Sequence, residues 1–457
     1  MLKSLLHSLL GSVTLICFMH SSLSGDVSES VPLPEDYFEN LREILDLAGT
    51  RAPALVQVGL EREIADQELR IARARYYPTL GVSGNFGYRF EDRGDGGEDF
   101  ESVSVNASLG LSRPLYHWGS IKAQVNIGEI NFENSLIQTR QSFQDVIVRL
   151  REDYLRLVLS EMRLRNARLR RNILEQEIAQ KAADFEAGVM SDEAYLNFQI
   201  DLENSLLEID DLEMRKDRLV AEFSRIAGLD REIPIPARVD ALDIEALDRL
   251  FGNQFAGSSW IDQTDEVRLS QNEMEKESRN RIIVNSRQTP NLSFSANISQ
   301  RPVNTANEND VNTISYFAGI SVGWNIFDGF ATQASKRISF LRSRKLEFEH
   351  RNILSTRQLD ETELRERIQI QLRKHKLLES QLDLFSRVYQ RAKRDHEMGQ
   401  TSANDLRESQ LQFYNLELRV HESRVELLMM LTRYLVLTGR DRGLQYLKFD
   451  TQTASYR

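Results

Sequence analysis

The chain has 457 residues, of which 41% are hydrophobic and 28% charged, and its mean hydropathy is −0.43. Its formal net charge is −11, with Lys and Arg interleaved among Asp and Glu. This pattern excludes nucleic-acid binding as the main activity, because chains that neutralise phosphates gather their basic residues on one face. The nine Pro residues fall outside the long stretches rich in Leu and charged residues, as long uninterrupted helices require.

The first 24 residues predict a signal peptide. Lys3 supplies a positive start, Leu9 to Met19 is apolar, and small residues precede a cleavage site near Gly25. A membrane anchor is the alternative, but this apolar run is short for a bilayer span. The only cysteine, Cys17, lies in this segment and lacks the small preceding residues of a lipoprotein site, so the mature chain is expected to contain no cysteine. After the leader, no apolar run reaches the 18 residues of a transmembrane helix.

Two pairs of alternating stretches follow, at about residues 79–113 and 291–326. Alternation places one set of side chains on each face of a sheet. The apolar set includes aromatic residues such as Phe86 and Tyr88, whereas the polar set is small and neutral, as at Ser83. A soluble β-sandwich gives a similar alternation. However, strands of about 11 residues have the length that a tilted transmembrane strand needs, and the polar segments 91–101 and 300–311 are typical of external loops.

Long helical arms come after each strand pair. Nothing breaks a helix from Ile121 to Gly188, a span of roughly 100 Å at ~1.5 Å per residue. We expect Gly188 and Gly399 to end one helix of each arm in the left-handed conformation, and Ser191 and Ser402 to cap the next helix. Alternating steps of three and four residues, with polar interruptions at His421 and Thr432, predict a coiled-coil seam on the last return helix. Its apolar members are Leu411, Tyr414, Leu418, Val425, Leu428 and Leu435.

The two arms are copies of one unit. Gly399 follows Gly188 by 211 positions, and the same offset relates Gly439 to Gly228 and Phe327 to Tyr116. The predicted organisation is a first repeat at 25–230, a second repeat at 231–442 that opens with a linker, and a tail at 443–457. Four strands cannot close a barrel or cover their own edges, so the chain is expected to oligomerise.

Several short motifs resemble one known family. They are Ala52-Pro53-Ala54-Leu55, Tyr77-Pro78-Thr79-Leu80, Leu115-Tyr116-His117-Trp118-Gly119, Ile326-Phe327-Asp328-Gly329 and both Gly-x-x-Ser turns. In this order, and with the internal repeat, the chain resembles the TolC-like outer membrane efflux proteins. It departs from the family's usual residues at His117, Phe330 and His396.

The resemblance implies a mixed fold. Three copies of the chain would form a 12-stranded transmembrane β-barrel, with four strands from each, continued by an α-helical coiled-coil barrel. It also implies a place in the bacterial outer membrane with the helical part in the periplasm. The expected function is that of a passive export duct in a tripartite efflux or type I secretion system. Its partners would be a periplasmic adaptor protein and an inner-membrane pump, and the pump would select the cargo.

The candidate functional residues are carboxylates near the turns. Asp405 and Glu408 share a helix face, and the resemblance implies that they project into the constricted end of the tunnel, where three copies would form acidic rings. Asp192 and Glu193 are weaker candidates for the same pore gate. As an alternative, Ser402-x-x-Asp405 predicts a capping box at a helix start.

Trp324, late in the last alternating stretch, is expected at an interface with outer membrane lipid. No catalytic grouping, cofactor site or metal site is predicted, because the seven His residues form no His-x-x-x-His pair or cluster with carboxylates. The protein is therefore not expected to be an enzyme. The alternative function is that of a non-transport periplasmic coiled-coil scaffold or adaptor, which would normally carry a compact β-rich domain and lack aromatic strand faces.

Overall fold

A computed structural model describes residues 31–91, 100–229, 235–236, 238–239, 242–252, 258–303 and 311–446. The chain divides into two compact units. One comprises Met1–Leu55, Phe143–Trp260 and Gln358–Arg457, and the other comprises Val56–Ser142 and Ile261–Arg357. The predicted signal peptide at 1–24 lies outside the described residues, as do the central parts of both predicted loops and residues 447–457 of the predicted tail.

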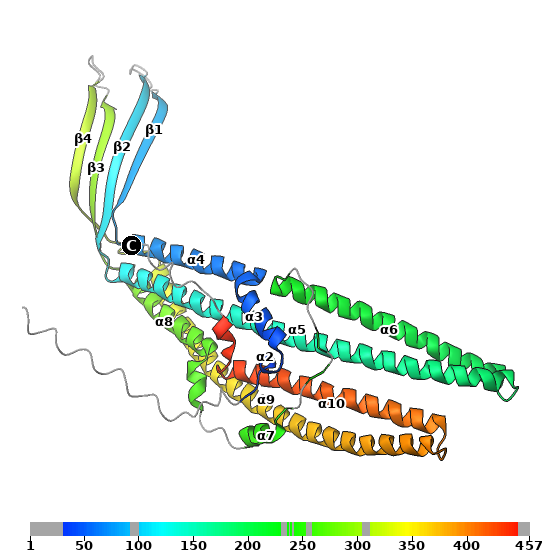
Figure 1. Cartoon of the computed structure of the whole chain (residues 1–457). Helices are drawn as coiled ribbons and strands as arrows, with labels where there is room; N and C mark the ends of the chain where they lie inside the picture. The colour runs from blue at the N-terminus through cyan, green and yellow to red at the C-terminus, as the bar shows by residue number, and fades with distance from the viewer. Residues whose placement is uncertain are drawn as a thin grey trace, which may run out of the picture. The chain divides into compact units, whose positions relative to one another are not determined.

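The second unit contains a four-stranded antiparallel sheet in the order β1-β2-β3-β4 (Figure 1). The strands are β1 (Thr79–Glu91), β2 (Phe100–Tyr116), β3 (Asn291–Val303) and β4 (Val311–Gly323). A mostly helical chain with one such sheet confirms the predicted mixture of helices and strands. The strands have 13 or 17 residues, more than the predicted ~11.

The ends of the strands correct the predicted boundaries. β2 continues past residue 113 to Tyr116, whereas β4 ends at Gly323 and not at residue 326. Gly323 pairs with Asn291, the first residue of β3, so residues after Gly323 have no partner on that strand. β1 and β2 also extend into the predicted loop 91–101, where Glu91 pairs with Phe100, and β3 and β4 likewise extend into 300–311.

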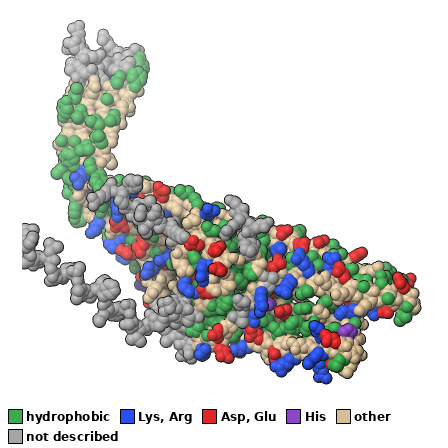
Figure 2. All heavy atoms as spheres, in the orientation of Figure 1, with side chains coloured by type: hydrophobic (Ala, Val, Ile, Leu, Met, Phe, Trp, Pro, Cys, Tyr) green, Lys and Arg blue, Asp and Glu red, His purple; other side chains and the backbone are tan. Residues whose placement is uncertain are grey.

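One face of the sheet is apolar and open. Val82, Phe86 and Tyr316 are exposed over 80%, 79% and 75% of their surface. The paired residues Phe86 and Val105 share this face, as do Ile298 and Tyr316. Figure 2 shows hydrophobic side chains spread over the strands, whereas acidic and basic side chains are interleaved over the helices.

Helices of the second unit are joined by polar contacts. α4 (Pro53–Ala74) meets the start of α5 (Ser120–Glu186) through an ion pair of 3.1 Å between Arg73 and Glu129. α8 (Asp265–Ser286) contacts α5 through Arg140 and Asp265, and it contacts the first part of α9 (Ala331–Glu397) through Glu266 and Arg357, which lie 2.6 Å apart.

The first unit holds two helical hairpins (Figure 1). α5 runs to its turn and returns as α6 (Asp192–Ala227), and α9 returns as α10 (Ala403–Leu437). α5 and α9 have 67 residues each, roughly 100 Å of helix. The remaining elements are α2 (Pro34–Tyr37), α3 (Glu39–Arg51), α7 (Ile244–Gly252) and the 3₁₀ turns η1 (Ser258–Gln263) and η2 (Arg442–Tyr446), so the predicted tail begins inside η2. None of the helices in the described ranges is both long enough and apolar enough to cross a bilayer.

The core of the first unit lies where these helices meet the segments near both ends of the described chain. Tyr154 of α5 is fully buried and packs edge-on against Phe38, with ring centroids 5.4 Å apart. Phe251 of α7 packs in the same way on Tyr434 of α10, at 5.0 Å. Part of the predicted seam lies in this core, because Val425, Leu428 and Leu435 are buried. Leu411, Tyr414 and Leu418, nearer the turn, are half-buried.

A buried ion cluster is set into this core. Arg151 of α5 donates hydrogen bonds to both carboxylate oxygens of Glu35 and, over 2.7 Å, to Asp441. The side chains of Arg151 and Asp441 are fully shielded from solvent, and that of Glu35 is nearly so. Burial opposes the charge of Arg151, but the two carboxylates outweigh it and raise the pKa of the guanidinium. The cluster fastens α2 and the segment after α10 to α5.

Candidate functional site

The turn of the first hairpin follows the end of α5. Gly188 has a φ of 71°, a left-handed conformation that suits glycine. The N–H groups of Gly188 and Val189 donate to the carbonyls of Phe185 and Asp184, both at 2.9 Å. The side chain of Ser191 then accepts from the N–H of Ala194 at 3.3 Å, which caps α6. The next two residues, Asp192 and Glu193, lie exposed in the first turn of α6.

The second turn has the same plan. Gly399 has a φ of 72°, and the N–H of Gln400 donates to the carbonyl of Asp395 at 2.7 Å. The side chain of Ser402 accepts from the N–H of Asp405 at 3.2 Å, while the carboxylate of Asp405 accepts from the backbone N–H of Ser402 at 3.3 Å. Asp405 is thus the acidic member of a capping box at the start of α10.

Glu408 lies one turn after Asp405, and both side chains are exposed. Its carboxylate accepts a hydrogen bond from Gln412 at 3.1 Å, so it has no part in the cap. Asp405 and Glu408 are spaced by three residues and lie on one side of α10, free to meet solvent or another molecule.

Nearby arginines contact other groups in this chain. Arg391 pairs with Asp395 at 3.5 Å, and Arg394 donates to the carbonyl of Gln390 at 3.3 Å. Arg407 is only 8% exposed. It contacts Asn404 and donates to Gln180 of α5 at 3.1 Å, with Glu177 at 3.9 Å. Arg407 thereby joins the two hairpins just behind the second turn, a contact between residues 227 positions apart that sequence spacing does not reveal.

One buried and one half-buried histidine lie farther along the second hairpin. His375 of α9 is fully buried, with Nε2 3.1 Å from Glu379, which also accepts from Arg424 at 2.8 Å. Burial lowers the pKa of His375, and the charge of Arg424 adds to this effect against that of Glu379. Burial also lowers the pKa of His421 to about 4, together with the positive charges of Arg424, Arg238 and Arg165. In the described ranges no group of three or more His, Cys, Asp and Glu side chains is placed to hold a metal ion.

Trp324 lies just after β4 and is 57% exposed. Its indole N–H donates to the carbonyl of Gln288 at 3.0 Å, and Trp118 likewise donates to the carbonyl of Pro290 at 2.8 Å. The two indoles therefore brace the turn that leads from α8 into β3, and each leaves part of its ring exposed.

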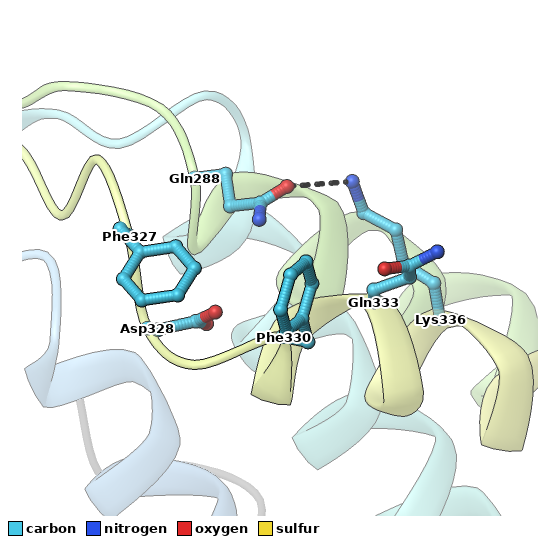
Figure 3. Close-up of a pocket in the computed structure, with 6 residues that line it drawn as sticks. All are labelled: Gln288, Phe327, Asp328, Phe330, Gln333 and Lys336. Carbon is cyan, nitrogen blue, oxygen red and sulfur yellow. Dashed lines mark hydrogen bonds between the residues drawn. The ribbon is translucent and has the colours of Figure 1, made fainter.

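A pocket of about 290 Å³ follows Trp324, where β4 gives way to α9 (Figure 3). The exposed rings of Phe327 and Phe330 meet edge-on at 5.4 Å, and Lys336 donates to Gln288 at 3.2 Å. Phe330 holds a φ of 68°, unusual for a residue other than glycine. Asp328 caps α9 by accepting from Thr332 at 2.9 Å, and hydrogen bonds from Thr332 lower the pKa of its carboxyl group.

Comparison with known proteins places these features in a family context. Residues 44–228 match the model of the family described as outer membrane efflux protein. Protein CyaE of Bordetella pertussis is 27% identical over 217 residues, which is 46% of this chain and 44% of that protein. The chain thus aligns with less than half of that relative's length.

Solved channels share the fold over most of the chain. The outer membrane channel CmeC of Campylobacter jejuni superposes with a TM-score of 0.73 at 14% identity, covering 94% of this chain and 91% of that one. The open state of the MtrE outer membrane channel of Neisseria gonorrhoeae gives a TM-score of 0.71 at 15% identity, covering 92% and 93%. The resemblance to the TolC-like outer membrane efflux proteins is therefore confirmed by the family's sequence model over residues 44–228, and nearly the whole chain has the fold of solved outer membrane channels.

Proposed function

We propose that this chain is one of three identical subunits of a passive export duct in the bacterial outer membrane. Three four-stranded sheets would close a 12-stranded barrel, and the helical arms would continue the duct through the periplasm. The duct would work with a periplasmic adaptor and an inner-membrane pump, in a tripartite efflux or type I secretion system. The similarity to efflux channels supports this proposal.

The observation that carries the proposal is the incomplete sheet. β1 and β4 are its outer strands, and among the described residues neither pairs with a further strand. Its apolar face is exposed as well, with Phe86 and Tyr316 open to solvent in the single chain. Unpaired edges and a large apolar face are both unfavourable in water. Closure with other copies in a bilayer would satisfy the edges and cover the face with lipid.

The helical hairpins offer a second pair of open edges. α5 contacts α6 through Arg168 and Glu213 at 2.6 Å, and it contacts α10 through Arg163 and Glu422 at 2.7 Å. α9 in turn contacts α10, so α6 and α9 stand at the ends of this series. Each end carries an exposed apolar stripe at seven-residue spacing, which is the pattern of a coiled-coil seam: Ile200, Leu207 and Met214 on α6, and Ile370, Leu377 and Leu384 on α9. In the trimer, α9 of one copy would pack on α6 of the next.

The assembly can be tested through these stripes. The purified protein should have the mass of a trimer in detergent and form stable conductance steps in planar bilayers. Leu377→Glu places a charge at an exposed position of the single chain, so it should weaken the trimer without unfolding the subunit. Lys393→Glu, at an exposed polar position of α9, is the matched control and should stay trimeric. A wild-type protein that is a stable monomer in detergent refutes the proposal.

We further propose that Asp405 and Glu408 form two acidic rings at the end of the duct. Asp192 and Glu193, exposed in the matching turn of the first hairpin, would add to the negative charge. Three copies would bring six carboxylates of Asp405 and Glu408 close together, and their repulsion favours bound cations. The contact between Arg407 and Gln180 would help to hold the end closed, because it ties the two hairpins of each copy together.

Glu408→Gln is the clean test of the gate, because Glu408 lies outside the capping box. It should reduce cation selectivity and block by trivalent cations in bilayers while leaving thermal stability unchanged. Asp405→Ala should do the same but also weaken the start of α10 by roughly 0.5–2 kcal/mol through loss of the cap. A variant that combines Glu408→Gln with Asp405→Ala gives the deciding result. If it has a lower melting temperature but keeps the cation selectivity of the wild type, Asp405 is only a cap and the gate lies elsewhere.

A further inference from the structure

The face of the sheet opposite the apolar one carries a polar groove of about 420 Å³. Every residue that lines it except Ala107 has an amide or a hydroxyl side chain, and none is charged. On this face the amides belong to Asn85, Asn106 and Asn297, and the hydroxyls to Ser83, Ser108 and Ser299. The paired residues Ala107 and Gln300 also line the groove but alternate with them, on the register of the apolar face. These residues come from β1, β2 and β3, so the groove crosses three adjacent strands.

Some hydrogen-bonding capacity of the groove is used and some is not. The hydroxyls of Ser83 and Ser108, which face each other across β1 and β2, lie 2.7 Å apart. The amide oxygen of Asn106 is shielded from solvent and has no hydrogen-bond partner among the described residues. A shielded acceptor without a partner is unfavourable, and rotation of the Asn106 amide towards a donor on a bound molecule would relieve it.

One aromatic ring breaks the pattern of this face. Along β4, Ser315, Phe317, Gly319 and Ser321 alternate with the apolar set, so Phe317 shares the face of small and polar residues. It is 58% exposed and stands directly opposite Asn297, a groove residue. The ring lies over Gly319, where an added Cβ would come within 3.0 Å of Phe317 Cζ. Gly319 therefore leaves room for the ring to lie along the sheet beside the groove.

The chemistry of the groove selects among classes of ligand. A charged ligand would find no opposite charge among the lining residues, and an apolar one would leave the amides without partners. A sugar ring presents hydroxyls on its rim, which suit Asn, Gln and Ser, and C–H groups on its face, which suit an exposed aromatic ring.

We infer that this groove, with Phe317 at its edge, is a binding site for neutral saccharides. The site lies within one chain and needs no residue from a neighbouring copy. It rests on the proposed function only in that this face would line the duct. An oligosaccharide would span the groove, with one sugar unit stacked on Phe317 and hydrogen-bonded to Asn297 and a later unit hydrogen-bonded to Asn106, which lies four residues further along β2.

The test uses the full-length protein in a detergent without a sugar headgroup, with maltohexaose as the probe. Saturation-transfer NMR should show the oligosaccharide binding, and in planar bilayers it should interrupt the single-channel current in a concentration-dependent way. Phe317→Ala should weaken binding by about tenfold, as expected for loss of an aromatic contact, and Phe317→Trp should restore it. Tyr316→Ala, one residue away on the opposite face, is the matched control and should leave binding unchanged.

The outcomes separate the site from the duct. If no channel forms but NMR shows binding that depends on Phe317, the duct is refuted and the saccharide site stands. If channels form and maltohexaose neither binds nor blocks, the site is refuted and the duct stands. Stronger binding of a neutral aromatic probe such as benzyl alcohol, or equal loss in Phe317→Ala and Tyr316→Ala, also overturns the saccharide site.

Discussion

The guanidinium of Arg151 lies between Glu35 and Asp441, with all three side chains withdrawn from water. Removing the cation leaves two buried carboxylates without compensation, a change that typically costs about 3–5 kcal/mol. Arg151→Ala should therefore lower the free energy of unfolding by that amount, as measured by denaturant titration in detergent. Arg156→Ala removes an exposed arginine that pairs with Asp153 at 3.2 Å, and it should cost less than about 1 kcal/mol. Similar losses in the two variants would contradict this account.

His421 couples the stability of α10 to pH. Burial and nearby cations lower its pKa from 6.5 to about 4 in the folded protein, so the unfolded chain binds the proton more readily. The contribution of the neutral ring is fully present above pH 6.5 and is lost as the pH falls from there towards 4. The melting temperature should therefore drop across this window, and it should drop less in His421→Gln. An NMR titration that gives His421 a pKa near 6.5 in the folded protein would exclude the effect.

Sequence reasoning named Arg391, Arg394 and Arg407 only as candidate partners of the gate carboxylates. It did not find Arg151 or the contact between Arg407 and Gln180, and the cause is separation along the chain. The partners of Arg151 lie 116 and 290 positions away, and no local period links such residues. The cap at Asp405 was accessible because a capping box has a fixed spacing of three residues. The role of Glu408 depends on neighbouring copies, so it is still a prediction.

At the scale of elements, the glycines after α6 and α10 occupy corresponding positions at the ends of the two return helices, 211 residues apart. Gly228 and Gly439 have φ values of 67° and 69°, so an added side chain strains the backbone at either position. At Gly228 a Cβ would also lie 2.5 Å from the carbonyl oxygen of Arg51, whereas at Gly439 it would meet nothing within 4 Å. Gly439→Ala should cost about 1–2 kcal/mol, and Gly228→Ala clearly more. Thermal melts of the two variants give the comparison. Equal losses of stability would show that the backbone at Arg51 shifts to make room for the added Cβ.

The elements that sequence patterns located are those with a strong local signal. Alternation located the four strands, and the glycine and serine turns gave the ends of α5 and α9 within two residues. The end of β4 was predicted too late because Trp324 and Ile326 continue the alternation in the sequence. The strand nevertheless ends at Gly323, which pairs with Asn291, the first residue of β3. α3 and α7 went unpredicted because they are short, with 13 and 9 residues, and a short apolar segment does not by itself distinguish a helix from a strand.

At the scale of the whole molecule, the proposed position in a membrane can be tested at Trp324. The indole is 57% exposed and keeps a hydrogen bond to the turn before β3, an arrangement that suits the boundary between lipid and water. Brominated lipid should quench tryptophan fluorescence of the reconstituted protein, and Trp324→Phe should remove part of that quenching. Trp118→Phe gives the corresponding difference for the other braced indole. Quenching that is unchanged in Trp324→Phe would place Trp324 away from lipid.

The equal lengths of α5 and α9 limit how this molecule can change during evolution. Each residue turns a helix by about 100°. A one-residue insertion in an arm would therefore rotate every later side chain by about 100° and remove the apolar ones from the coiled-coil seam. Seven residues nearly restore the facing and lengthen a helix by about 10 Å. The same insertion is needed in the outgoing and the return helix of both hairpins if the two hairpins are to keep equal lengths. Related chains with longer or shorter arms should therefore differ by heptads gained or lost in four helices together.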